Sequence, residues 1–214
     1  MTTTTSRVNV VINAENKPKN LPSFKDIIEQ CFVMGPLQST TTNINGVRLT
    51  LVKKSNNDTT YVWVKSGHAI TMGEAKTQSF VAQFLNNKAH SAVRAPQVYL
   101  AFTWSGLGYI IMEYIDGQIC GNSDVALVAA AVQSLITIPS PTSAPGPVGG
   151  GVIEHPFFIE QTSSIWYESV EELEDHINGV SVPLCLALSL SHLSCFQMIT
   201  LNTDFRRHEG ERAC

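Results

Sequence analysis

The chain has 214 residues, of which 43% are hydrophobic and only 15% are charged, and its formal net charge is −4. This length is enough to bury a core in one domain or two small lobes without help from disulfides. The mild and scattered charge excludes a nucleic-acid-binding surface, which would need clustered Lys and Arg side chains.

The N-terminal segment is polar. Residues 1–22 are rich in Thr and Asn and are interrupted by two prolines, which predicts a flexible tail. Regular structure is expected to begin at Ser23, because Ser23 followed three residues later by Asp26 is an N-cap pattern, with apolar residues at helical spacing behind it. A short first helix is therefore predicted.

The next part of the chain has a strand pattern. Residues 46–55 and 59–67 are rich in β-branched and aromatic residues, and the segment SNNDTT between them favours a turn. Residues 71–90 then change to a helical period. We expect an antiparallel hairpin followed by one helix. The apolar stripe of this helix is predicted to consist of Phe80, Val81, Phe84 and Leu85.

A second strand pair follows the helix. The segments PQVYLAFTW and GLGYIIMEYI have the same strand-like composition, and Ser105 with Gly106 marks a tight turn between them. The predicted order is therefore hairpin, helix, hairpin.

The character of the chain changes after Gly117. An Ala-rich apolar segment predicts a largely buried helix that begins at Ser123 or Asp124. A Pro/Gly/Ser-rich connection over residues 139–151 follows, and a short acidic helix is predicted from Ser169. The glycine cluster of the connection lacks the GK[ST] pattern and opens no helix, so a connecting loop is favoured over a phosphate-binding loop.

Lys65 and Glu74 are the charged residues with the most informative spacing. Lys65 ends an apolar strand segment, and Glu74 follows in the first turn of the helix. Because Glu74 lies two turns before Val81, it shares the face expected to pack on the sheet. A buried carboxylate without a partner is costly, so an ion pair with Lys65 is predicted. The alternative is that Lys65 extends into solvent and Glu74 simply favours a helix N-terminus.

Residues 59–117 resemble the N-terminal lobe of the aminoglycoside-phosphotransferase and choline-kinase-like family, relatives of the protein kinases. The strand GYIIMEYIDG stands where a kinase hinge is expected, and APGPVGGG, HPFF and SVEELEDHI resemble a fungal-type subgroup. The resemblance implies an α+β fold, with a protein-kinase-like N-lobe (an antiparallel five-stranded sheet plus one helix) and an incomplete helical C-lobe. The expected parts are a tail (1–22), the N-lobe (23–116), a partial C-lobe (117–179) and an aberrant apolar tail (180–214).

The resemblance also implies a nucleotide site. Lys65 would contact the α- and β-phosphates of ATP, and Glu74 would hold the lysine in place. Glu113, Tyr114 and Ile115 would form the hinge, whose backbone groups meet the edge of the adenine.

The loop that covers the phosphates would lie between residues 37 and 47. This stretch has a single glycine, Gly46, and no GxGxxG pattern. It therefore departs from the protein kinases, although the family's own loop often relies on Ser and Thr.

The catalytic groups of the family are missing. Phosphoryl transfer needs an Asp that accepts the hydroxyl proton, an Asn a few residues later and a second Asp for Mg²⁺. Neither His192 nor Asp204 stands in an HxDxxxxN or Asp-Phe-Gly pattern. The family transfers phosphate from ATP to a small-molecule hydroxyl, but this chain is expected to be inactive, with no ligands for Mg²⁺. The alternative is a pseudokinase or a nucleotide- or partner-binding module.

The last part of the chain has an unusual composition. Residues 180–201 contain no Asp, Glu, Lys or Arg and are long enough to cross a bilayer. Their Ser, Pro, His and Gln residues lower the hydropathy, so a membrane anchor is the less favoured interpretation. Translation into a retained intron near Val180 and Ser181 is the hypothesis that explains the change in composition.

The compartment is predicted from two further features. The N-terminus lacks the apolar run of a signal peptide, and the five cysteines are widely spaced with no CxxC pair, which predicts reduced thiols and neither a disulfide framework nor a zinc site. A cytoplasmic protein is expected. Its partners would be a nucleotide and, in a complete relative, an unidentified small-molecule acceptor.

Overall fold

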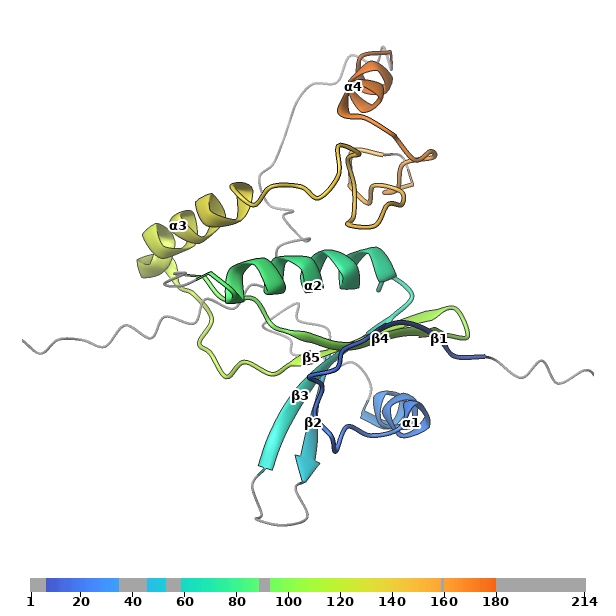
Figure 1. Ribbon diagram of the computed structural model, residues 1–214, viewed down its shortest axis with the longest axis vertical. Helices are drawn as coiled ribbons and strands as arrows, with labels where there is room; N and C mark the ends of the chain where they lie inside the picture. The colour runs from blue at the N-terminus through green and yellow to red at the C-terminus, as the bar shows by residue number, and fades with distance from the viewer. Residues whose placement is uncertain (1–6, 35–45, 53–58, 89–92, 159, 180–214) are drawn as a thin grey trace, which may run out of the picture.

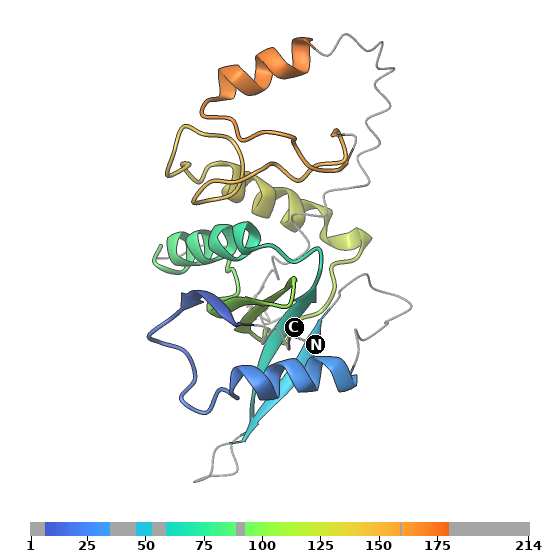
Figure 2. The same ribbon diagram turned by 90° about the vertical axis from the view of Figure 1, so that its right-hand side faces the viewer.

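The computed structural model describes residues 7–34, 46–52, 59–88, 93–158 and 160–179. Its core is a five-stranded antiparallel sheet with a helix on each face, and the described chain from residue 125 onward lies beyond one of these helices (Figure 1, Figure 2). The predicted α+β class and the five-stranded antiparallel sheet are therefore confirmed.

The strands run across the sheet in the order β1-β4-β5-β3-β2. All neighbours are antiparallel, and β5 is the central strand, with β4 on one side and β3 on the other. The strands are β1 (Asn9–Asn13), β2 (Val47–Val52), β3 (Thr59–Gly67), β4 (Val98–Trp104) and β5 (Leu107–Glu113).

Both predicted hairpins are present. In the first, β2 pairs with β3, with Val47 opposite Val64. In the second, Ser105 and Gly106 connect β4 to β5 with φ angles of 53° and 78°. Positive φ at both central residues is typical of a type I′ turn, whose twist matches that of the strands. The local turn chemistry therefore sets the register of the β4–β5 pair.

Strand β1 corrects the prediction for the N-terminus. The segment 1–22 was expected to be a flexible tail, but Asn9–Asn13 form the edge strand of the sheet, with Asn9 opposite Thr103 and Asn13 opposite Leu100. The run VNVVI has strand propensity, but its partner β4 lies far along the chain. This fifth strand is thus stabilised by a long-range pairing that no local pattern indicates.

Helix α1 (Phe24–Met34) covers one face of the sheet (Figure 2). It has the predicted cap, since the Asp26 amide donates to Ser23 Oγ at 3.3 Å and the Ser23 amide donates to Asp26 Oδ2 at 3.2 Å. Ile27 is fully buried in the cluster that also contains Phe102 of β4. The apolar face of α1 therefore closes the larger core.

Helix α2 (Met72–Asn86) covers the opposite face (Figure 1). Its buried residues are Ala75, Ala82 and Leu85, and the two alanines allow the helix to lie close to the sheet. Phe84 is 36% exposed. The predicted stripe is therefore wrong in detail, since only Leu85 is buried among Phe80, Val81, Phe84 and Leu85.

The helix predicted to begin at Ser123 or Asp124 is α3 (Val125–Ile136), which follows a short 3₁₀ turn over Asn122–Asp124. Ala131 packs with Ala82 of α2. The expectation that this helix is largely buried is wrong, because Ala131 is its one buried residue in the described structure. Exposed fractions between 39% and 66% are found for Val125, Leu127, Val128, Val132 and Ile136.

The remaining described chain is mostly irregular, as the Pro/Gly/Ser composition predicts. Its glycine loop lies against α2, where the Val148 amide donates to Thr77 Oγ1 at 2.9 Å. The predicted acidic helix is α4 (Val170–Gly179), and the Glu172 amide donates to Ser169 Oγ at 3.2 Å at its start. This part of the chain adds a third layer above α2 (Figure 2).

Candidate functional site

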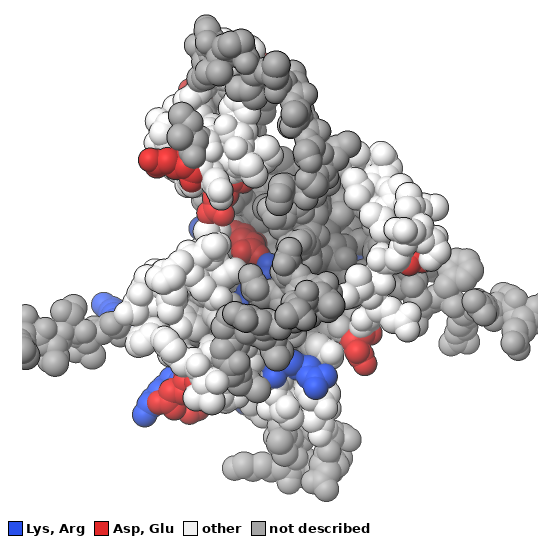
Figure 3. Space-filling view, turned by 180° about the vertical axis from the view of Figure 1, so that it is seen from behind, with Lys and Arg blue, Asp and Glu red and all other residues white. Residues whose placement is uncertain are grey.

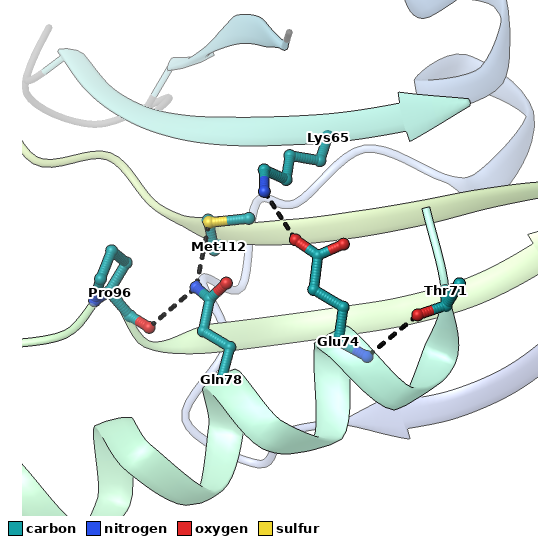
Figure 4. A network of polar contacts seen from close by, with 6 residues as sticks. All are labelled: Lys65, Thr71, Glu74, Gln78, Pro96 and Met112. Atoms are coloured by element: carbon teal, nitrogen blue, oxygen red, sulfur yellow. Dashed lines mark hydrogen bonds and ion pairs between the residues drawn. The ribbon is translucent and has the colours of Figure 1, made fainter. Parts of the chain in front are cut away.

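The predicted ion pair between Lys65 and Glu74 is present. Lys65 Nζ lies 2.6 Å from Glu74 Oε1, and the two side chains are 16% and 29% exposed (Figure 4). Thr71 caps α2, because its Oγ1 accepts a hydrogen bond from the Glu74 amide at 3.2 Å. In a Thr-x-x-Glu capping box the Glu side chain would normally reach back to the cap. Here its carboxylate points to β3, so the cap fixes the backbone while the side chain holds the lysine.

Gln78 holds α2 in place one turn further along. Its Nε2 donates to the Pro96 carbonyl at 3.3 Å and lies 3.1 Å from Met112 Sδ (Figure 4). Met112 is fully buried and belongs to the small cluster under α2. Helix α2 therefore contacts β3 through Glu74 and β5 through Gln78. With both contacts in place, Glu74 has little freedom to move away from Lys65.

Glu113, the first residue of the predicted hinge, has a structural role. Its amide donates to the Gln97 carbonyl at 2.8 Å, its carboxylate accepts from the Gln97 amide at 3.3 Å, and it forms an ion pair with Arg94. Because its amide already has a partner within the protein, only its carbonyl could serve a ligand. Ile115, the third residue of the predicted hinge, is half-buried.

Tyr114, the second residue of the predicted hinge, belongs to a cluster that no sequence pattern indicates. Its ring lies 5.7 Å from that of Tyr61 and 6.4 Å from that of Trp63, measured between centroids. The Arg48 guanidinium lies 4.8 Å from the Tyr61 centroid and 5.5 Å from the Tyr114 centroid. A cation over two aromatic faces is favourable, so these four residues form a platform beside the predicted hinge.

Trp63 has an unusual polar atom. Its indole Nε1 is buried and has no hydrogen-bond partner, alone among the buried side-chain nitrogens and oxygens of the described residues. A buried donor without a partner costs about 1–3 kcal/mol. The alternation of side chains along β3 places Trp63 on the same face as Lys65, so the indole and the ion pair share the face of the sheet that α2 covers.

A second carboxylate approaches the ion pair from the C-terminal half. Burial, and then the negative charge of Glu74, raises the pKa of the Glu154 carboxyl. Glu154 belongs to an isolated bridge with Thr162. Acidic and basic side chains meet in a hollow in the middle of the face shown in Figure 3. No sequence pattern predicts this approach, because Glu154 lies in an irregular segment.

Several expectations concern groups outside the described residues. The phosphate-covering loop falls almost entirely within residues 35–45, and the apolar segment 180–201 is also outside the described part. Among the described residues, no group of three or more His, Cys, Asp or Glu side chains could hold a metal ion. None of the described helices is long and apolar enough to cross a membrane.

The ion pair provides a first prediction. Glu74→Gln is expected to lower the free energy of unfolding by about 1–2 kcal/mol, because the largely buried Lys65 ammonium loses its charged partner. Urea denaturation measures this. Glu29→Gln is the matched control, since Glu29 pairs with Lys25 at 3.7 Å with both side chains well exposed. Equal losses in the two variants would show that the Lys65 pair is no stronger than an ordinary surface pair.

Comparisons with known proteins identify no relative. No family model, curated protein or solved structure matches the chain.

Proposed function

We propose that this chain carries the nucleotide-binding lobe of a protein-kinase-like phosphotransferase and binds ATP at Lys65. The observation that supports this most is the ion pair of 2.6 Å between Lys65 on β3 and Glu74 in the first turn of α2. In kinases such a pair orients the lysine toward the α- and β-phosphates. An ammonium held by a single carboxylate oxygen keeps donors available for phosphate oxygens.

The position of the hinge agrees with this proposal. On β5, Glu113 is opposite Val62 of β3, whereas Lys65 is opposite Ile110. The hinge is thus three residues from Lys65 along β3, about 10 Å at the usual strand rise. A nucleotide could place its base edge at Tyr114 and Ile115 and its phosphates at Lys65. The order hairpin, helix, hairpin, with β3 and β5 side by side, supports a kinase-like N-lobe.

We propose binding without phosphoryl transfer for these 214 residues. They contain no HxDxxxxN segment, so the Asp that accepts the acceptor hydroxyl's proton in kinases is missing, and Mg²⁺ would be held by the phosphates of the nucleotide. A relative with the catalytic loop would transfer the γ-phosphate to a small-molecule hydroxyl. In the absence of that loop, nucleotide recognition is the activity that the Lys65 pair supports.

ATP-dependent thermal stabilisation tests the proposal. MgATP at several times its dissociation constant is expected to raise Tm by about 2–4 °C, and Lys65→Ala is expected to abolish the increase. Lys25→Ala is the matched control, because it also removes one lysine from an ion pair, but on the far face of the sheet. An equal increase in wild type and Lys65→Ala would place ATP elsewhere, and no increase in wild type would refute the proposal.

A further inference from the structure

Trp63 stands between the two ends of the proposed nucleotide site. It is two residues before Lys65 on β3, so both side chains are on the face that α2 covers. Its partner on β5 is Met112, the last residue before the hinge. Its ring centroid lies 6.4 Å from that of Tyr114, with the two planes tilted by 31°. A nucleotide that reached from Lys65 to the hinge would therefore have to place its base where the indole lies.

The indole is held closely on this path. A Cβ atom built on Gly46 would lie 2.4 Å from three atoms of the Trp63 ring, one of which is Nε1. The backbone of Gly46 thus covers the polar edge of the indole. On its other side Trp63 packs against the small cluster of buried residues under α2. The base end of this path is therefore filled by the indole, and the Lys65–Glu74 ion pair stands at the phosphate end.

The buried position is also unfavourable for the polar atom of the indole. Its Nε1 is buried without a hydrogen-bond partner among the described residues, and native proteins rarely leave such a donor unpaired. If the ring turned toward solvent, the N–H would bond to water, which would offset part of the apolar contact that is lost. A position that is well packed but poor in hydrogen bonds suits a side chain that a ligand can displace.

We propose that Trp63 determines which ligand binds at Lys65, by closing the path from Lys65 to the hinge to a purine ring unless the indole turns away. The inference rests on the proposed nucleotide function. With the indole in place, the site accepts the phosphate part of the ligand alone, so inorganic tripolyphosphate binds at least as tightly as ATP. Removal of the indole opens the base end without changing the phosphate end.

Calorimetric titration of the full chain with MgATP and with tripolyphosphate tests this. Trp63→Ala is expected to tighten MgATP binding by about tenfold or more, since the displacement cost disappears, and to leave tripolyphosphate binding unchanged. Trp63→Val keeps a residue favoured in strands and serves as the second variant if the alanine variant does not fold. Trp166→Ala is the control, because Trp166 is 59% exposed and lies against Gly150. Lys65→Ala tests whether tripolyphosphate binding depends on Lys65.

The outcomes separate the two proposals. Tighter MgATP binding in the Trp63 variants, with tripolyphosphate unchanged, supports the inference. If tripolyphosphate binding depends on Lys65 but the Trp63 variants bind MgATP equally or more weakly, the inference is overturned while the nucleotide site stands. If neither ligand binds in a Lys65-dependent way to any of these proteins, the proposed function fails and the inference fails with it.

Discussion

Gly108→Ala is expected to destabilise the protein by about 3 kcal/mol or more. A Cβ atom on Gly108 would lie 1.9 Å from the carbonyl oxygen of Ile70 and 2.8 Å from its carbonyl carbon. Both are backbone atoms, so no side-chain rotation relieves the overlap. Ile70 belongs to the connection between β3 and α2, where its amide donates to the Gly67 carbonyl. The new methyl group must therefore push this connection off the sheet.

The same displacement would reach the candidate site, because the connection ends at Thr71, the residue that caps α2 and fixes the Glu74 backbone. Urea denaturation measures the loss of stability. Gly106→Ala is the matched control, since Gly106 has a positive φ of 78° but no atom within 4 Å of the added Cβ, so only the conformational penalty of about 1 kcal/mol applies. Similar losses in the two variants would show that the contact with Ile70 relaxes freely.

Phe102→Ala is expected to lower the free energy of unfolding by about 3–5 kcal/mol. Phe102 is fully buried, stacks on Tyr109 with centroids 4.8 Å apart and meets the edge of Phe24 at 5.0 Å. The truncation leaves a cavity between α1 and the sheet that rigid strands cannot fill. It also removes the aromatic contact that holds the start of α1.

Phe84→Ala is the control for this change, because the same side chain is removed from a site on α2 that is 36% exposed. A loss below about 1 kcal/mol is expected there. Chemical denaturation followed by circular dichroism compares the two variants. A small loss in Phe102→Ala would mean that α1 packs loosely on the sheet, contrary to the closed core described above.

Most of the sheet could be predicted because its signals are local. The β4–β5 hairpin is encoded by Ser105 and Gly106, two adjacent residues that adopt positive φ, and the cap of α1 by Ser23 and Asp26. The contact between Lys65 and Glu74 is also nearly local, because a short connection joins the end of β3 to the start of α2. Patterns of this kind depend on neighbours in the chain, and they can be read without knowing the rest of the fold.

The parts that could not be predicted depend on distant segments. Strand β1 reads as a polar tail until β4 provides its partner. The sequence of α3 is apolar enough for a buried helix, yet Ala131 is the one residue it buries within the described structure. The prediction for the side of α2 that faces the sheet is wrong because alanines, not phenylalanines, allow the close approach. The packing of Trp63 under Gly46 likewise follows from strand pairing and from no motif.

Labelling with an acyl-phosphate derivative of ATP tests the nucleotide site most directly. In this reaction a lysine amine close to the phosphates attacks the acyl carbonyl, takes the acyl group and releases ATP, and mass spectrometry then identifies the modified lysine. We expect Lys65 to be acylated, excess ATP to suppress the labelling, and Lys76, which lies on α2 two residues after Glu74, to react far less. If Lys65 stays unmodified, or reacts no faster than Lys76 and is not protected by ATP, the nucleotide does not bind at the Lys65–Glu74 pair.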